Sequence, residues 1–201
     1  MKIALLGNGK MGKQISKLAK KRGHTIVCIA SSKKPAHTLD LTNSDIAIDF
    51  STPTSALINI SHAINSGIPV ISGTTGWIDN LKKAENLCQE KKGAFLYASN
   101  FSLGMNIFFD LNKKLAKLMQ HQSYKSFIHE IHHTEKLDSP SGSAKTLERQ
   151  MNEILKHKTP ISSKRITDKI GTHTVTYLSP VDELEIKHTA KNRDGFVMGA
   201  I

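Results

Sequence analysis

The chain has 201 residues, 38% hydrophobic and 22% charged, a length that suits one large domain or two small ones. Its 28 Lys and Arg residues against 17 Asp and Glu give a formal net charge of +11. The basic residues are almost all lysines spread along the chain, and aromatic residues make up only 5%, so the composition argues against nucleic-acid binding and favours a basic surface that attracts small anions.

The first 101 residues alternate short apolar runs with stretches of helical periodicity. The apolar runs predict strands at residues 2 to 6, 24 to 30, 45 to 50, 68 to 72 and 94 to 98. The stretches between them predict a helix ending at Gly23, a second from Pro53 towards Gly67 capped by Ser51 or Thr52, and a third capped by Asp79 and running through Lys92. This alternation predicts a parallel sheet covered by helices on both faces.

The regular alternation of strands and helices ends after Asn100. Helical patterns cover residues 103 to 120 and 143 to 156, and extended runs cover 126 to 133, 161 to 166, 172 to 178 and 183 to 189. Strands that follow one another without helices favour an open mixed sheet. We therefore predict an α/β chain with a Rossmann-type parallel-sheet domain at residues 1–101 plus 192–201 and a smaller α+β domain at residues 102–191.

The hydrophobic runs of the chain are all strand-sized. None approaches the ~18 residues of a membrane helix, and the run at Ile3 to Leu6 is too short for the ~7 to 15 residue core of a signal peptide. We therefore expect no membrane partner and a cytoplasmic location.

A glycine motif follows the first predicted strand. In Gly7-x-Gly9-x-x-Gly12 the first glycine permits a tight turn, the second lets the backbone approach a pyrophosphate, and the third lets helix and strand pack closely. The N–H groups at the start of the next helix would then face the phosphates. The motif predicts dinucleotide binding at residues 7 to 12, that is at Gly7, Asn8, Gly9, Lys10, Met11 and Gly12, the alternative being a glycine turn that serves packing alone.

The end of the second predicted strand indicates which dinucleotide is bound. An enzyme that uses NAD usually has an acidic residue there, but this chain has Ser31, Ser32, Lys33 and Lys34. Hydroxyl and ammonium groups suit a 2′-phosphate better than a free diol, so Ser32 and Lys33 favour NADPH, with NADH as the other option. A solvent-exposed lysine pair would look the same.

Residues 129 to 133 match the zinc-protease pattern His-Glu-x-x-His. That pattern needs a helix to bring both histidines to one face, whereas this segment reads as a strand that runs into a Pro/Ser/Gly loop. We therefore predict no metal site. A strand and loop would instead bring His132, His133 and Lys136 near the Ser141 to Ser143 segment, where imidazole, ammonium and N–H groups suit a small acidic substrate. A surface histidine cluster before an ordinary capped helix remains the alternative.

Longer motifs resemble one known family. They are Gly-Asn-Gly-Lys-Met-Gly at 7 to 12, Asp-Phe-Ser-Thr-Pro at 49 to 53, Gly-Thr-Thr-Gly at 73 to 76, Ala-Ser-Asn-Phe-Ser-Leu-Gly-Met-Asn at 98 to 106, and Glu-Ile-His-His-Thr-Glu-Lys-Leu-Asp-Ser-Pro-Ser-Gly-Ser-Ala at 130 to 144. Gly-Thr-His at 171, His-Thr-Ala at 188 and Arg-Asp-Gly-Phe at 193 complete the order. Together they resemble the 4-hydroxy-tetrahydrodipicolinate reductases, or dihydrodipicolinate reductases, of lysine and diaminopimelate biosynthesis.

The resemblance implies hydride transfer from NADPH, or NADH, to a cyclic unsaturated imine dicarboxylate, giving tetrahydrodipicolinate. It implies that His132 is the catalytic acid/base and Lys136 the proton donor, and that His133, Ser141, Gly142 and Ser143 bind the substrate carboxylates. Further cofactor contacts would come from residues after the later strands of the first domain, namely Phe50, Gly73, Thr74, Thr75, Ala98, Asn100 and Phe101. It also implies a homotetramer formed through the second domain.

Two features depart from the family pattern. Ser143 stands where the family more often has Thr, a change that keeps the hydroxyl donor. Family chains also continue beyond the Gly-Ala-Ile at 199 to 201 with a helix and a strand, and without such a helix one sheet face would be exposed at a cost of ~25 cal/mol per Å² of apolar surface. The alternative function is therefore a catalytically impaired NADP-binding paralogue.

Overall fold

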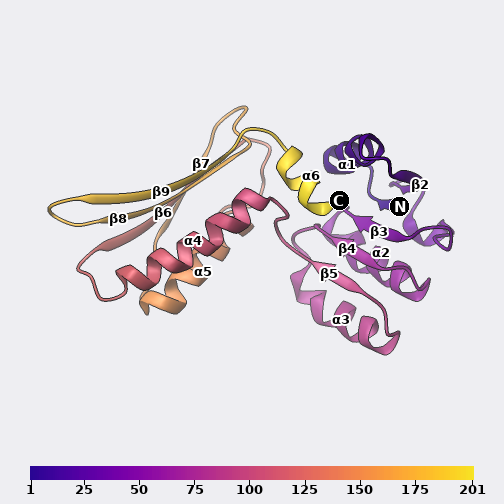
Figure 1. Cartoon of the computed structure of the whole chain (residues 1–201), viewed down its shortest axis with the longest axis horizontal. Coiled ribbons are helices and arrows are strands. Elements are labelled where there is room, and N and C mark those ends of the chain that lie inside the picture. The colour runs from indigo at the N-terminus through magenta and orange to yellow at the C-terminus, as the bar shows by residue number, and fades with distance from the viewer. The chain divides into compact units, whose positions relative to one another are not determined.

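A computed structural model describes all 201 residues, and the contacts within it divide the chain into two compact units (Figure 1). The first unit contains Met1–Phe101 and Phe196–Ile201, and the second contains Ser102–Gly195. We expected the second domain to end at residue 191. The second unit extends to Gly195, and within the added residues the Arg193 guanidinium lies 3.2 Å from Nε2 of His133.

The first unit contains a five-stranded parallel sheet, as the sequence predicted. Its strands are β1 (Lys2–Leu6), β2 (Thr25–Ala30), β3 (Ile46–Asp49), β4 (Val70–Ser72) and β5 (Phe95–Tyr97), in the spatial order β2-β1-β3-β4-β5. The order reverses direction between β1 and β3, and ligands of open α/β sheets bind at such a switch point, outside the carboxyl ends of the strands.

Helices cover both faces of this sheet (Figure 1). They are α1 (Lys10–Lys21), α2 (Pro53–Asn65), α3 (Leu81–Glu90) and the short α6 (Asp194–Ala200), with 3-10 turns η1 (Ala36–Thr38) and η2 (Ile78–Asn80). On one face Leu6 of β1 belongs to the same buried cluster as residues of α2 and α3. On the other face Leu5 packs in a cluster with Ile15 of α1 and Val197 of α6, all three fully buried.

Two predicted helix caps are wrong in detail. Asp79 does not cap the third helix, because it lies inside η2, and α3 begins at Leu81 with Asn80 at the N-cap position. That helix also ends at Glu90 rather than at Lys92, whose φ of 50° is left-handed. Thr52 stands at the N-cap of α2, but its hydroxyl bonds the Ser55 hydroxyl instead of a backbone N–H.

The second unit contains a four-stranded mixed sheet in the order β7-β6-β8-β9, which confirms the predicted α+β architecture. Its elements are α4 (Leu103–Met119), β6 (Lys125–His132), α5 (Gly142–Leu155), β7 (Ile161–Arg165), β8 (Gly171–Leu178) and β9 (Glu183–Ala190). β6 pairs with β7 in parallel and with β8 antiparallel. The two helices pack on one face, where Phe108 and Leu147 form a core with Ile128, Val175 and Tyr177 (Figure 1).

None of the helices in either unit is long and apolar enough to cross a membrane.

Candidate active site

The glycine motif forms the turn between β1 and α1, and each glycine meets a different environment. Gly7 has a φ of +133°, and a Cβ there would lie 2.1 Å from the Phe50 carbonyl oxygen. A Cβ at Gly12 would lie 2.0 Å from the Gly7 carbonyl oxygen. A Cβ at Gly9 would meet nothing within 4 Å. The first and third glycines are therefore needed for the turn and the helix to fit, whereas the backbone at Gly9 has open space beside it that a ligand can enter.

The loops after β3 and β4 are held together by a buried carboxylate. Asp49, at the end of β3, is fully buried and accepts hydrogen bonds from Asn59 Nδ2 at 2.9 Å, Ser72 Oγ at 2.9 Å and Thr74 Oγ1 at 2.7 Å. Burial raises the pKa of Asp49, and these hydrogen bonds oppose the shift. The Thr74 hydroxyl also accepts from the backbone N–H of Ser51 at 2.8 Å, so its position is fixed from both sides.

The aromatic ring of Phe50 shapes the same edge of the sheet. A Cβ at Gly73 would lie 2.2 Å from Cζ of Phe50, so only glycine fits beneath the ring. The Phe101 ring lies 5.9 Å from that of Phe50, centroid to centroid. Ser32 and Lys33 occupy the exposed tip of a tight turn after β2, closed by backbone hydrogen bonds between Ser31 and Lys34.

All the predicted cofactor residues thus follow the carboxyl ends of strands in one parallel sheet. Residues 7 to 12 follow β1, Ser32 and Lys33 follow β2, Phe50 follows β3, residues 73 to 75 follow β4, and residues 98 to 101 follow β5. Because parallel strands end at the same edge, the fold brings these segments of the first unit to one side of its sheet.

In the second unit, the segment that matches His-Glu-x-x-His is a strand, as predicted. Strand alternation sends neighbouring side chains to opposite faces. His129 therefore lies on the face opposite Glu130 and contacts the Ser162 hydroxyl at 2.6 Å, while Glu130 and His132 are buried beside the helices. The second histidine of the motif, His133, lies just beyond the end of β6 and contacts Arg193, so an extended backbone separates it from His129 and the two rings cannot share one metal ion in the helical manner of a zinc protease.

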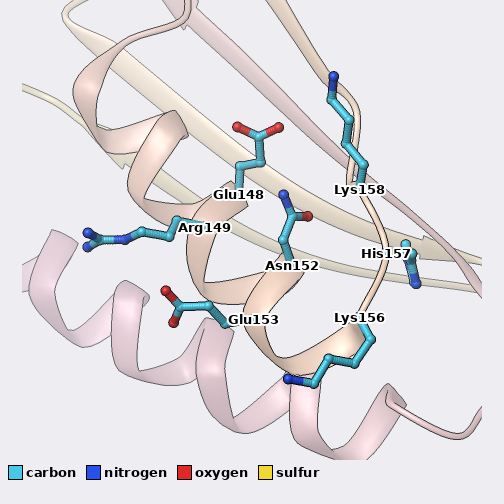
Figure 2. A pocket seen from close by; sticks show the side chains of 7 residues that line it. All are labelled: Glu148, Arg149, Asn152, Glu153, Lys156, His157 and Lys158. Atoms are coloured by element: carbon cyan, nitrogen blue, oxygen red, sulfur yellow. The ribbon is translucent and has the colours of Figure 1, made fainter.

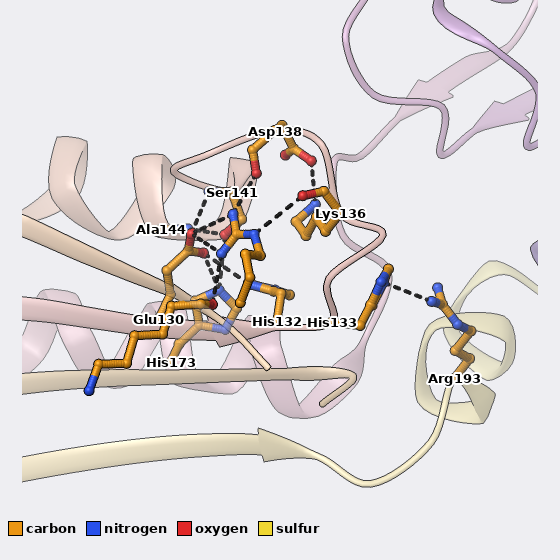
Figure 3. A network of polar contacts seen from close by, with 11 residues as sticks. Glu130, His132, His133, Lys136, Asp138, Ser141, Ala144, His173 and Arg193 are labelled. Carbon is orange, nitrogen blue, oxygen red and sulfur yellow. Dashed lines mark hydrogen bonds and ion pairs between the residues drawn. The ribbon is translucent and has the colours of Figure 1, made fainter. Parts of the chain in front are cut away.

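Glu130 is the centre of a buried polar network (Figure 3). Its Oε1 accepts from the Ser141 backbone N–H at 3.1 Å and from the Arg165 guanidinium at 3.3 and 3.4 Å. Its Oε2 lies 3.2 Å from Nδ1 of His132 and 3.7 Å from Nε2 of His173. Burial alone would raise the pKa of Glu130, but hydrogen bonds from His132 and Ser141 outweigh it and hold that pKa well below its usual value.

His173 lies on β8 directly opposite Glu130. Burial and the neighbouring His132 lower the pKa of His173 to about 3, so the ring is neutral at physiological pH. One donor atom from each of Glu130, His132 and His173 lies within 4.8 Å of the others, close enough to share a cation. A bound metal ion would, however, be repelled by the guanidinium of Arg165, which already balances the carboxylate.

The loop that follows β6 carries the other predicted catalytic residue. The ammonium of Lys136 lies 2.7 Å from the Asp138 carboxylate. Asp138 is partly buried, which would raise its pKa, but the hydrogen bond from Lys136 outweighs this and lowers the pKa. Arg165 donates to the carbonyl oxygens of both Lys136, at 3.3 Å, and Asp138, at 2.6 Å, and so fixes the loop to β7. His133 points away from this group, towards Arg193 (Figure 3).

The predicted carboxylate-binding residues form the start of α5. Ser141 is its N-cap, and the Ser141 hydroxyl accepts from the Ala144 N–H at 3.2 Å and lies 3.2 Å from Nε2 of His173. Ser141 is almost fully buried, whereas Gly142 and Ser143 are half-buried in the first turn. An N-terminal turn offers N–H donors and a partial positive charge to an anion.

Sequence reasoning did not single out Arg165, and it quoted Glu130, His173 and Arg193 only as parts of longer motifs, without a role for any of them. The signal for Glu130 was available, because it stands two residues before His132 on a predicted strand and so shares its face. Arg165 gave no local signal, since it reaches the site through strand pairing. Arg193 stands in a motif, but that motif does not reveal its contact with His133, which is 60 residues away in sequence.

A separate hollow of about 690 Å³ lies at the carboxyl-terminal end of α5 (Figure 2). Its walls carry both charges, with Arg149, Lys156 and Lys158 beside Glu148 and Glu153. None of the predicted site residues lines it, and the mixed charges select no ligand.

Two family models match almost the whole chain. The model described as dihydrodipicolinate reductase, N-terminus, matches residues 1–101, and the one described as its C-terminus matches residues 104–201. A relative from Christiangramia forsetii named 4-hydroxy-tetrahydrodipicolinate reductase is 48% identical over 214 residues, covering 100% of this chain and 90% of the relative. A relative of the same name from Thermosipho africanus is 32% identical over an alignment that covers 100% of this chain and 88% of the relative.

The fold also matches solved structures. A dihydrodipicolinate reductase from a Paenisporosarcina species, described with dipicolinate bound, superposes with a TM-score of 0.75 at 21% identity, covering 99% of this chain and 91% of that one. A probable dehydrogenase from Thermotoga maritima gives a TM-score of 0.63 at 9% identity, covering 100% of this chain and 85% of that one.

Proposed function

The chain belongs to the dihydrodipicolinate reductase family, as its motifs indicated, and on that basis we propose that it reduces 4-hydroxy-tetrahydrodipicolinate with a nicotinamide cofactor. The observation that carries the proposal is the identity of 48% to a reductase of that name along the full length of this chain. The reaction would be a step of lysine and diaminopimelate biosynthesis.

The first unit has the features that a dinucleotide needs. The open space beside Gly9 lets a pyrophosphate approach the backbone, and α1 begins at Lys10 directly behind it, so its free N–H groups face the same place. Thr74, held by Asp49 and Ser51, and Gly73, under the Phe50 ring, would border the nicotinamide. When bound, the reduced nicotinamide supplies the hydride.

We propose that NADPH is preferred over NADH. Ser32 and Lys33 stand exposed at the tip of the turn after β2, where a dinucleotide's ribose lies in this class of fold. Their hydroxyl and ammonium groups can bind a 2′-phosphate, and no carboxylate is present at residues 31 to 34 to bind a free diol.

In the second unit, an acidic substrate would bind at the start of α5. Gly142 and Ser143 offer N–H and hydroxyl donors there, and Arg193, whose guanidinium contacts Nε2 of His133, adds positive charge. His132 and Lys136 would exchange protons with the substrate, and their contacts with Glu130 and Arg165 in one network support this role. Ser141 would act mainly by capping the helix, since its hydroxyl is buried and already has partners.

We also propose that the protein forms a homotetramer through the second unit. The sheet face opposite α4 and α5 is not covered by a helix, and the apolar side chains of Phe127 and Leu178 on that face are 40% and 42% exposed. Light scattering would give the subunit number directly, and a monomer would contradict this part of the proposal.

The expected cytoplasmic location stays a prediction.

The function is tested by a coupled assay in which the substrate is generated enzymatically and cofactor oxidation is followed by absorbance. We expect dicarboxylate-dependent oxidation of NADPH, and slower oxidation of NADH. A protein that binds NADPH but oxidises it no faster with substrate than without would be the impaired paralogue, and the proposed activity would be wrong.

A further inference from the structure

The two oxygens of the Glu130 carboxylate lie in different surroundings. Oε1 accepts from three N–H groups, the Ser141 backbone N–H and two of the Arg165 guanidinium. Oε2 faces two imidazole rings, with His132 Nδ1 at 3.2 Å and His173 Nε2 at 3.7 Å. The carboxylate is therefore fixed in orientation by Oε1 and presents Oε2 to the histidines (Figure 3).

The contact between Oε2 of Glu130 and Nδ1 of His132 leaves little choice of proton position. Both atoms are buried and neither makes a well-aligned hydrogen bond to any group, so each is the other's nearest polar neighbour only through this 3.2 Å electrostatic contact. An ionised carboxylate can only accept, so a ring nitrogen 3.2 Å from it is stabilised as a donor. A lone pair on Nδ1 would instead face the negative oxygen without water to screen it.

We infer that Glu130 is a positioning residue that keeps a proton on Nδ1 of His132, so that Nε2 is the atom that exchanges a proton during the reaction. The catalytic part of this inference rests on the proposed function. Nε2 lies beside Gly171, where a Cβ would come within 3.1 Å of it, so the glycine leaves this edge of the ring uncrowded.

Arg165 makes this arrangement stable. Its positive charge offsets the cost of burying the carboxylate, and its hydrogen bonds to the Lys136 and Asp138 carbonyl oxygens tie Glu130 to the loop that carries Lys136. One buried ion pair thus sets both the ring of His132 and the loop of Lys136. His173, which is neutral, does not compete with Arg165 for the carboxylate.

The substitution Glu130→Gln tests this inference, because the glutamine amide has one hydrogen-bond acceptor, its oxygen, and one hydrogen-bond donor group, its NH₂. The three N–H groups around the Oε1 position require the carbonyl oxygen there, so the NH₂ group must occupy the Oε2 position. A donor facing Nδ1 of His132 requires a lone pair on that atom. The substitution should therefore move the ring proton from Nδ1 to Nε2 with no change in side-chain size.

The experiment measures the tautomer directly. Full-length protein labelled with ¹⁵N at histidine is observed by two-bond proton–nitrogen correlation at neutral pH, and the His132 signals are assigned by their loss in His132→Gln. We expect the proton on Nδ1 in the wild type and on Nε2 in Glu130→Gln. In the coupled assay Glu130→Gln should lower kcat about 100-fold while the substrate KM changes little. Glu185→Gln, exposed on β9, is the matched control and should change neither.

A wild-type His132 with its proton on Nε2 would overturn the inference, and this result does not need any variant to fold. An unchanged tautomer in folded Glu130→Gln would also overturn it. A wild type that fails to reduce the substrate would overturn the proposed function, while the tautomer measurement would stand on its own.

Discussion

Thr74 donates its hydroxyl proton to Asp49 over 2.7 Å and so joins the loop after β4 to the end of β3. The carboxylate accepts from three side chains, and an amide at this position could accept at only one atom. We expect Asp49→Asn to lower the free energy of unfolding by about 1 to 3 kcal/mol and to weaken NADPH binding. Urea denaturation and fluorescence titration would measure the two effects. Asp79→Asn, on an exposed turn, is the control, and equal effects in both variants would contradict the role of Asp49.

The glycine turn offers a comparison within one motif. Gly7→Ala combines a positive φ of +133° with a Cβ only 2.1 Å from the Phe50 carbonyl oxygen, so it should destabilise the fold by about 3 kcal/mol or more. Gly9→Ala meets open space and should change stability by at most about 1 kcal/mol, yet its methyl group should lower NADPH affinity at least about tenfold. Thermal denaturation and cofactor titration separate these effects. Unchanged affinity in Gly9→Ala would mean that the phosphates bind elsewhere.

The preference for NADPH depends on the turn after β2. Removing the Lys33 ammonium should raise the Kd for NADPH about tenfold and leave the Kd for NADH unchanged, because only NADPH carries the 2′-phosphate. Lys17→Ala removes the same charge from an exposed position of α1 and should have no such selective effect. If Lys33→Ala raised the Kd values for NADPH and NADH equally, the turn would not distinguish the 2′-phosphate from the 2′-hydroxyl.

His132 and Lys136 should be needed for turnover rather than for cofactor binding. We expect His132→Gln and Lys136→Ala each to lower kcat by about 10² to 10⁴ with little change in the Kd for NADPH. His129→Gln is a matched control on the same strand, since the His129 ring lies on the opposite face beside Ser162. If both His132→Gln and Lys136→Ala kept the wild-type kcat, neither residue would take part in the reaction.

The Glu130 network should make the fold sensitive to acid. The pKa of Glu130 is lowered in the folded protein, so its contribution to stability is present above its ordinary value of 4.5 and is lost as the pH falls below that value. Glu130→Gln should be about 3 to 5 kcal/mol less stable than the wild type near neutral pH. Urea denaturation between about pH 7 and pH 3 should show this difference shrinking in acid. A constant difference would mean that ionisation of Glu130 contributes nothing.

The sequence predicted the strands, most of the helices and the positions of the site segments, because each follows from a local pattern. Hydrophobic runs reveal buried strands, and parallel strands bring their carboxyl ends together whatever the residues between them. Arg165 could not be found in this way. It reaches Glu130 because β7 pairs with β6 in a register that places Arg165 opposite His132, and no local pattern specifies that register.

Helix α6 was missed for a different reason. It is 7 residues long and contains Gly195 and Gly199, which lower helix propensity. Its position depends on packing with distant residues. A Cβ at Gly199 would lie 1.8 Å from the Phe101 carbonyl oxygen, so the glycine that weakens the helix is also what lets it approach the chain after β5.

The way the first unit is assembled affects the order in which the protein can fold during synthesis. Val197 is fully buried against Leu5 and Ile15, yet the ribosome makes it only after the entire second unit. The part of this sheet face that Val197 covers, beside α1, therefore stays exposed to solvent while the second unit, about half of the chain, is being translated. A nascent chain stalled before Phe196 would expose that apolar surface to chaperones and proteases.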